Sequence, residues 1–152
     1  MFTTLVVAVL DNPAKQYMFS VKERVKLLKE SIDSIPGICS DLASCDIIVE
    51  SYSGLLVDYI KKINADCVLR SLRSEADCAY ELPMAQTNRR MAAQSGIHFE
   101  TVALFANQAY SCISSGLVRE IAQAGYSGGF DDTLLDEWVP IPVKTALRNK
   151  FK

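Results

Sequence analysis

The chain has 152 residues, of which 49% are hydrophobic and 22% are charged. This size suits one globular domain with a core large enough to fold without disulfide or metal support. A net charge of -2 argues against nonspecific nucleic-acid binding, which depends on a clear excess of positive charge.

The first predicted element is a buried strand at residues 4–10, where valine recurs as in a strand covered on both faces. Asp11-Asn-Pro13 ends this strand because proline has no N–H to donate to a sheet, and Lys15 lies in the turn that follows. Ser20-Val-Lys-Glu23 is a capping box, which predicts the start of a helix that ends near Pro36.

Two short strands are predicted next, at Asp46–Val49 and Cys67–Leu69, with an amphipathic helix from about Leu55 to Ile63 between them. Strands that alternate with helices are typical of a parallel sheet with helices on its faces. Ligands of such sheets lie beyond the carboxyl ends of the strands, so polar residues that follow the strands should converge at one edge. These residues are Lys15, Ser53, Arg70 and Ser114.

Arg70 and Arg73 follow the third strand at this edge. Guanidinium groups remain charged and match the geometry of phosphate, so the two arginines could clamp an anion. An isolated pair of this kind is more often part of a solvated surface. Acidic residues come next, and then a predicted helix that contains Leu82 and Met91.

A fourth strand is predicted within residues 98–106, and Tyr110–Glu120 joins it to another helix. Ser114 or Ser115 can cap this helix, whose free N–H groups and positive dipole end suit a phosphate. Two serines before a helix more often act only as a cap, so a phosphate site needs support from other segments.

The last part of the chain predicts a loop and a final helix. Residues 125–138 contain Ser127-Gly-Gly129 and several acidic side chains, which favour an irregular loop or flap. Pro140-Ile-Pro142 predicts the start of a helix that covers residues 140–151. The whole pattern predicts one α/β domain over residues 1–152, with a Rossmann-like, doubly wound parallel sheet.

The five cysteines are odd in number and contain no Cys-x-x-Cys pair, so neither a disulfide framework nor a zinc site is indicated. A reducing cytoplasm suits them. The apolar run at the start has no basic region or cleavage site and is too short to span a bilayer, so we expect neither a secretion signal nor a membrane partner.

Several segments, in the same order along the chain, carry a family resemblance. They are Val7–Lys15, Phe19–Arg24, Tyr52–Asp58, Arg70–Arg73, Tyr80–Glu81, Met84–Arg89 and Ile113–Glu120. Together they resemble the bacterial phosphopantetheine adenylyltransferases of the nucleotidyltransferase superfamily. The resemblance implies transfer of an adenylyl group from magnesium-bound ATP to 4'-phosphopantetheine, giving dephospho-coenzyme A and pyrophosphate.

The resemblance also implies roles for individual residues. Lys15 and Arg73 would act as catalytic cations, and Lys15, Leu56 and Arg70 would bind the pantetheine substrate. The implied ATP contacts are Ser71, Leu72, Arg73, Glu81, Tyr110, Ser111, Ile113, Ser114, Ser115 and Gly116. No protein ligand for a metal is implied, since Mg²⁺ would arrive with ATP. The likeness further suggests a homohexamer that also binds dephospho-coenzyme A or coenzyme A.

The chain departs from the family pattern at its start. The family opens with a strand, a Thr-x-Gly-His motif and a helix, and we expect this sequence to lack that unit of roughly 25 to 30 residues. The single histidine, His98, does not belong to such a motif. The absent strand is central in the family's sheet, so the edges of residues 4–10 and 67–69 should be uncovered.

Three functional hypotheses therefore remain open. The first is adenylyl transfer to 4'-phosphopantetheine. The second is a non-catalytic protein that binds nucleotide or coenzyme A or serves as an assembly partner, because the motif histidine is absent. The third is adenylyl or cytidylyl transfer to another phosphate acceptor, since related nucleotidyltransferases share the sheet and the helix that begins with serine.

Overall fold

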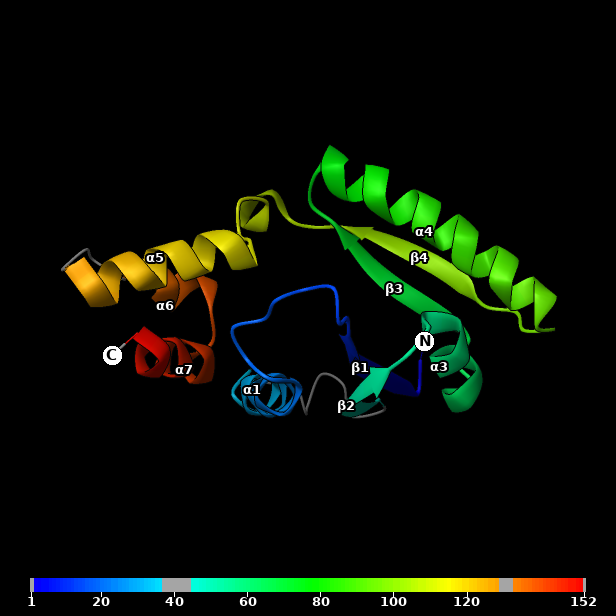
Figure 1. Cartoon of the computed structure of the whole chain (residues 1–152), viewed down its shortest axis with the longest axis horizontal. Helices are drawn as coiled ribbons and strands as arrows, with labels where there is room; N and C mark the ends of the chain where they lie inside the picture. The colour runs from blue at the N-terminus through cyan, green and yellow to red at the C-terminus, as the bar shows by residue number, and fades with distance from the viewer. Residues whose placement is uncertain (1, 37–44, 129–132, 152) are drawn as a thin grey trace. The chain divides into compact units, whose positions relative to one another are not determined.

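The computed structural model describes residues 2–36, 45–128 and 133–151. The chain divides into two compact units, the first made of residues 1–53 with 113–152 and the second of residues 54–112. Each unit contains a pair of parallel strands, labelled in Figure 1. Each unit also has its own hydrophobic core. Among the described helices, none is long and apolar enough to cross a membrane.

In the first unit, strands β1 (Thr4–Asp11) and β2 (Asp46–Ser53) are parallel, with Asp11 opposite Ser53 at their carboxyl ends. Helix α1 (Val21–Asp33) packs against this pair. The predicted capping box is confirmed, because Ser20 Oγ accepts from Glu23 N and the Glu23 carboxylate accepts from Ser20 N. Strand β2 is longer than the predicted strand that ended at Val49.

Helices α5 (Ser115–Gly128), α6 (Leu134–Trp138) and α7 (Ile141–Phe151) complete the first unit. The buried residues of their core are Val118, Ala122, Leu135 and Leu147. Met18 and Phe19, from the segment just before α1, pack against this cluster. The end of the segment that carries Lys15 is thus anchored in the helical core.

The structure corrects the loop that we expected over residues 125–138. Helix α5 continues to Gly128 and α6 spans Leu134–Trp138, while residues 129–132 lie outside the described ranges. Leu135 is completely buried, and Trp138 packs against the same cluster. Burial of these apolar side chains outweighs the local loop signal from glycine and acidic residues.

In the second unit, strands β3 (Cys67–Leu72) and β4 (Glu100–Phe105) are parallel, with Leu72 opposite Phe105. The helical elements are α3 (Leu56–Ile63), α4 (Glu75–Gln94) and the short 3-10 helix η1 (Gln108–Tyr110). The buried core residues are Val57, Ile60, Ala92 and Phe99.

Two boundaries of the second unit differ from the sequence prediction. Strand β3 continues through Leu72, so Arg70 lies within the strand rather than after it. Helix α4 begins at Glu75 rather than near Leu82, because Ser74 Oγ accepts from Asp77 N and caps the helix there. Capping together with acidic residues in the first turn favours this early start, and Pro83 is accommodated inside the helix.

The predicted α/β class with parallel strands is confirmed, and each unit contains one pair of parallel strands. Among the described residues of each unit taken by itself, β1 pairs only with β2 and β3 pairs only with β4. Strands β1 and β3 are the two whose edges we expected to be uncovered. On one face of the second pair, Leu69, Val102 and Leu104 remain 41%, 38% and 54% exposed, so this apolar surface has no cover within its unit.

Candidate functional site

A cleft in the first unit contains Lys15 and has a volume of about 460 Å³. This volume lies in the range of roughly 300 to 1,000 Å³ that is common for small-molecule sites. One wall is the segment 15–19, and Arg24 of α1 lies beside it. The other lining residues come from helices α5 and α7 and are Ser115, Val118, Arg119, Val143 and Leu147.

The cleft is positively charged, because Lys15, Arg24 and Arg119 line it and no carboxylate is among its described lining residues. Arg119 Nε donates to the Ser115 carbonyl oxygen at 3.0 Å. Within residues 2–36, 45–128 and 133–151, the Lys15 side chain has no ion-pair partner. Its charge is therefore available to an anion.

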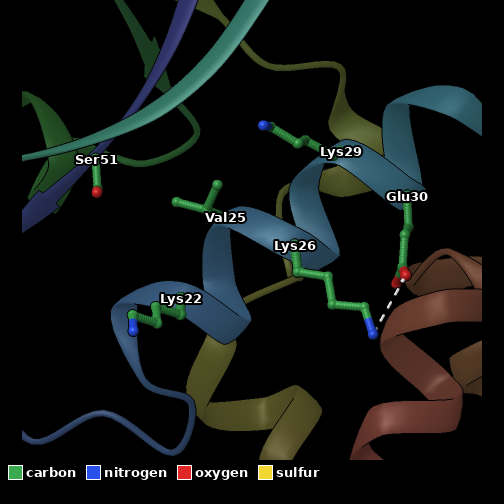
Figure 2. A pocket seen from close by; sticks show the side chains of 6 residues that line it. All are labelled: Lys22, Val25, Lys26, Lys29, Glu30 and Ser51. Carbon is green, nitrogen blue, oxygen red and sulfur yellow. Dashed lines mark ion pairs between the residues drawn. The ribbon is translucent and has the colours of Figure 1, made fainter.

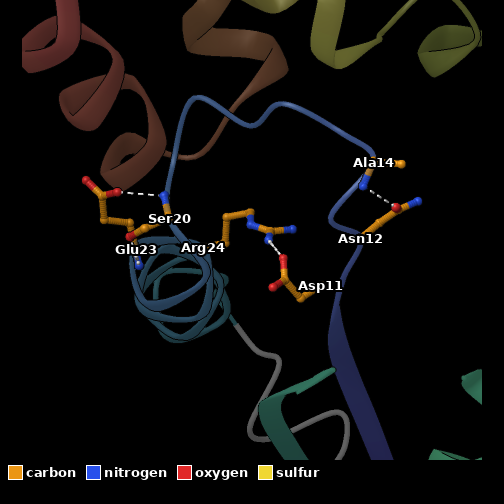
Figure 3. A network of polar contacts seen from close by, with 6 residues as sticks. All are labelled: Asp11, Asn12, Ala14, Ser20, Glu23 and Arg24. Carbon is orange, nitrogen blue, oxygen red and sulfur yellow. Dashed lines mark hydrogen bonds and ion pairs between the residues drawn. The ribbon is translucent and has the colours of Figure 1, made fainter. Parts of the chain in front are cut away.

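The turn that carries Lys15 is shaped by its own hydrogen bonds. Asn12 Oδ1 accepts from Ala14 N at 2.9 Å, as Figure 3 shows, and the Asn12 carbonyl accepts from Lys15 N at 3.1 Å. This side-chain bond to the backbone forms an Asx turn. It lies directly after the end of β1, where the sequence Asp-Asn-Pro predicted a turn.

Helix α5 brings its N-terminus to the same cleft. Ser114 Oγ accepts from Leu117 N at 3.2 Å, so Ser114 is the cap and Ser115 is the first helical residue. The N–H groups of this first turn lack helical acceptors, and the helix dipole is positive here. Both properties suit a phosphate in the cleft that Ser115 lines.

Gly116, another candidate ATP contact, lies in the first turn of α5. A β-carbon at this position would lie 3.8 Å from Ser114 Oγ, which is ordinary van der Waals contact. A β-carbon would therefore fit at this position without strain.

In the second unit, the predicted arginines already have carboxylate partners. Arg70 Nε lies 3.3 Å from Glu81 Oε2, so a predicted substrate contact and a predicted ATP contact are adjacent. Asp77 Oδ2 accepts from Arg73 N at 3.0 Å and from Arg73 Nε at 3.2 Å. The backbone N–H of Arg73 is the main cause that holds the pKa of Asp77 below its usual value.

The remaining candidates lie at the ends of elements. Leu56 begins α3, where backbone N–H groups lack helical acceptors, and Ser71 and Leu72 end β3. Tyr110 ends η1 and is 59% exposed, and Ser111 Oγ donates to the Gln108 carbonyl oxygen at 2.8 Å. Ile113 belongs to the first unit and packs on its helical core.

The structure thus assembles the candidates in two groups, with Lys15 beside Ser115 in the first unit and Arg70 beside Glu81 in the second. Convergence of Lys15, Arg70 and Arg73 on one phosphate remains a prediction. Sequence reasoning assigned no role to Arg24 or Arg119. The available signals were the position of Arg24 directly after the capping-box Glu23 and the spacing of four between Ser115 and Arg119 on one helix face.

A second groove in the first unit contains none of the predicted site residues. It has a volume of about 360 Å³ and is lined by residues of α1 and by Ser51 of β2 (Figure 2). The α1 residues are Lys22, Val25, Lys26, Lys29 and Glu30. Lys26 pairs with Glu30 at 3.6 Å, and its side chain is 73% exposed, as expected for a solvated helix face.

A family model described as cytidylyltransferase-like matches residues 1–121. The chain belongs to the cytidylyltransferase-like family. The phosphopantetheine adenylyltransferase of Caldanaerobacter subterraneus subsp. tengcongensis is 40% identical over 152 residues, a match that covers 100% of this chain and 82% of that enzyme. The family resemblance predicted from the ordered segments is confirmed, and the chain is a homologue of this enzyme. Every candidate residue from Lys15 to Gly116 lies within the cytidylyltransferase-like match.

Proposed function

We propose that this protein transfers the adenylyl group of ATP to 4'-phosphopantetheine, giving dephospho-coenzyme A and pyrophosphate, a step of coenzyme A biosynthesis. The observation that carries the proposal is the 40% identity, over the whole chain, to a phosphopantetheine adenylyltransferase. The cleft around Lys15 supports it, because Lys15, Arg119 and the N-terminus of α5 suit a polyphosphate.

In the proposed reaction, a phosphate oxygen of the acceptor attacks the α-phosphorus of ATP. The bond from that phosphorus to the oxygen shared with the β-phosphate breaks, and pyrophosphate leaves. Positioning and positive charge are the main contributions of a protein to such a step. Lys15 is the proposed cation between the acceptor and the nucleotide phosphates, and Arg119 and the first turn of α5 support the triphosphate.

The second unit supplies the remaining proposed contacts. Leu56 and Arg70 bind the pantetheine substrate, and Arg73 assists charge stabilisation at the nucleotide. The other proposed ATP contacts of this unit are Ser71, Leu72, Glu81, Tyr110 and Ser111.

Magnesium is proposed to enter as part of the substrate, Mg-ATP. Among the residues that the structure describes, no three His, Cys, Asp or Glu side chains are close enough to form a metal site. Phosphate oxygens and water are suitable ligands for Mg²⁺, so the substrate itself can carry the ion. By likeness to the family, we also propose a cytoplasmic homohexamer.

The test is pyrophosphate release from Mg-ATP and 4'-phosphopantetheine. Lys15→Ala should lower kcat/KM by about 10²- to 10³-fold, because it removes charge at the phosphoryl centre. Lys29→Ala removes a similar charge from the exposed face of α1 and should leave kcat/KM unchanged. Absence of pyrophosphate release by the wild type, or full activity of Lys15→Ala, would contradict the proposal.

A non-catalytic nucleotide-binding protein is the second candidate, for which the cleft around Lys15 would supply the binding site. Calorimetric titration with ATP and with coenzyme A separates it from the first candidate. Binding of either ligand without turnover would favour this alternative.

A change of substrate is the third candidate, favoured by the cytidylyltransferase-like description of the matched family. Assays with CTP in place of ATP, and with nicotinate mononucleotide or glycerol phosphate as acceptor, test it directly. We expect ATP and 4'-phosphopantetheine to give the highest kcat/KM, and equal use of the other substrates would remove the proposed specificity.

A further inference from the structure

Arg24 lies near the start of α1, and its guanidinium contacts both ends of the segment that carries Lys15. Nη2 lies 3.5 Å from Asp11 Oδ1, a contact drawn in Figure 3. The guanidinium carbon lies 3.9 Å from the centre of the Tyr17 ring, which is a cation–π contact. Asp11 ends β1 and Tyr17 lies just beyond Lys15, so one side chain closes this segment from the helix side.

The backbone of Arg24 is fixed by hydrogen bonds at the start of α1. Arg24 N donates to the Ser20 carbonyl oxygen at 2.9 Å, and Ser20 N donates to Glu23 Oε2 at 2.7 Å. Phe19, directly before this cap, packs in the helical core of the first unit. The start of α1 and the end of segment 15–19 are therefore held in place together. Arg24 links them to the turn around Lys15 through its contacts with Asp11 and Tyr17.

The environment of Arg24 is unusual for a side chain with only a packing role. Its side chain is 20% exposed, and its Nε is buried without a hydrogen-bond acceptor in the described structure. A buried N–H without an acceptor is destabilising, so a simple apolar residue would pack here at lower cost. Arginine at this position therefore points to a role for its contacts with Asp11 and Tyr17 in the cleft that Arg24 also lines.

We propose that Arg24 is a positioning residue that holds the Lys15 turn in place for phosphate binding, an inference that rests on the function proposed above for this cleft. A planar guanidinium can pair with Asp11 at its edge while its face stacks on Tyr17, which a lysine ammonium cannot do. Arg24 acts through Lys15, and its own charge is occupied by these two contacts.

The test is a double-mutant cycle on kcat and KM for pyrophosphate release, with Lys15→Ala, Arg24→Ala and the double variant. Arg24→Ala should lower kcat/KM by about 10- to 100-fold, since misplacement of a catalytic group is costly. On the Lys15→Ala background, the same substitution should have almost no further effect, because the group that Arg24 positions is gone. An equal loss on both backgrounds would overturn the proposal.

Further variants keep the proposal falsifiable if Arg24→Ala folds poorly. Tyr17→Leu removes the stack and should lower kcat/KM on the wild-type background, with almost no further effect on the Lys15→Ala background. Arg24→Lys keeps the charge without the planar contact and should recover only part of the activity. Full activity of both Arg24→Lys and Tyr17→Leu would overturn the proposed role of the stacking contact. Lys29→Ala is the control for loss of a positive charge.

The failure of this inference differs from failure of the proposed function. A wild type that releases no pyrophosphate refutes the function, and the same four proteins are then compared by their dissociation constants for ATP. Coupling between Lys15 and Arg24 in ATP binding would still support the positioning role. Additive losses in that measurement would overturn it.

Discussion

The two units share a plan of two parallel strands with packed helices, but they hold their proposed phosphate-binding cations differently. In the part of the chain that the structure describes, Lys15 has no ion-pair partner, whereas Arg70 and Arg73 contact Glu81 and Asp77. An unpaired ammonium can offer its full charge to a phosphate. A paired guanidinium must share its charge, but its position is defined in advance.

This difference suggests that the two units contribute to phosphate binding in different ways. In the proposed function, the first unit supplies the unpaired charge of Lys15, and the proposed role of Arg24 is to hold that charge in place. The second unit supplies arginines that carboxylates orient at the end of β3. If the reaction needs both kinds of cation, the same type of substitution should have unequal effects in the two units.

The largest expected effect concerns the two separate cores. Leu135→Ala in the first unit and Ile60→Ala in the second should each lower the free energy of unfolding by about 2–5 kcal/mol, because each leaves a cavity in a packed cluster. Hydrogen exchange of the backbone amides locates the damage. Leu135→Ala should speed exchange mainly in α5 and α7, and Ile60→Ala mainly in α3 and α4.

Leu82→Ala provides the control for these core substitutions, because Leu82 is 57% exposed on α4 and its truncation should change stability little. An equal rise in exchange across both units after either core substitution would show that they unfold as one body. The two hydrophobic cores would then not stabilise their units independently.

The next effect compares the cations directly. Lys15→Ala should lower kcat/KM by about 10²- to 10³-fold, while Arg73→Ala should cost only on the order of 10-fold because Asp77 already offsets part of its charge. Pyrophosphate release at saturating 4'-phosphopantetheine and varied ATP measures both. A larger loss for Arg73→Ala than for Lys15→Ala would reverse the assignment of roles.

Much of this arrangement was accessible from the sequence because it depends on local chemistry. The capping box at Ser20, the turn at Asp11-Asn-Pro13 and the cap at Ser114 each use a side chain that bonds to nearby backbone. The four strands were found from runs of apolar residues, although β2 and β3 extend beyond the predicted ends.

The errors and omissions share a different cause, which is packing between distant residues. Leu135 is helical because its helix is buried in a cluster with Val118 and Leu147, and no local signal reports that contact. Likewise, the contact of Arg24 with Asp11 depends on how β1 and α1 pack, so the sequence could show the arginine but not its partners.

A smaller effect compares two helix caps. Ser114 Oγ in the first unit and Ser74 Oγ in the second each accept a backbone N–H at 3.2 Å. Replacement of either serine by alanine should therefore lower the free energy of unfolding by about 1 kcal/mol. Ser114→Ala should also raise the KM for ATP more than Ser74→Ala does, because the helix that Ser114 caps borders the Lys15 cleft.

Urea unfolding and initial rates measure these two properties on the same preparations. Gly116→Ala is the matched control in α5, since a β-carbon fits there and should stabilise the protein by about 0.4–1 kcal/mol. An equal rise in KM for Ser114→Ala and Ser74→Ala would remove the distinction between the two caps.

The smallest effect is a pH dependence of the cap on α1. Hydrogen bonds from the Ser20 backbone N–H and the Ser20 hydroxyl, with help from Lys150, lower the pKa of Glu23 from 4.5 to about 2. The unfolded chain thus takes up a proton at higher pH than the folded chain does, so the stability contributed by Glu23 is present above pH 4.5 and is lost as the pH falls towards 2. The Tm of the wild type should exceed that of Glu23→Gln at pH 7, and the difference should shrink below pH 4.5.

Asp77→Asn should likewise lower the Tm at pH 7 and have a smaller effect in acid, since the pKa of Asp77 in the second unit is also lowered. A Tm difference that stays constant down to pH 2.5 would mean that the carboxylate charge of Glu23 does not stabilise this helix.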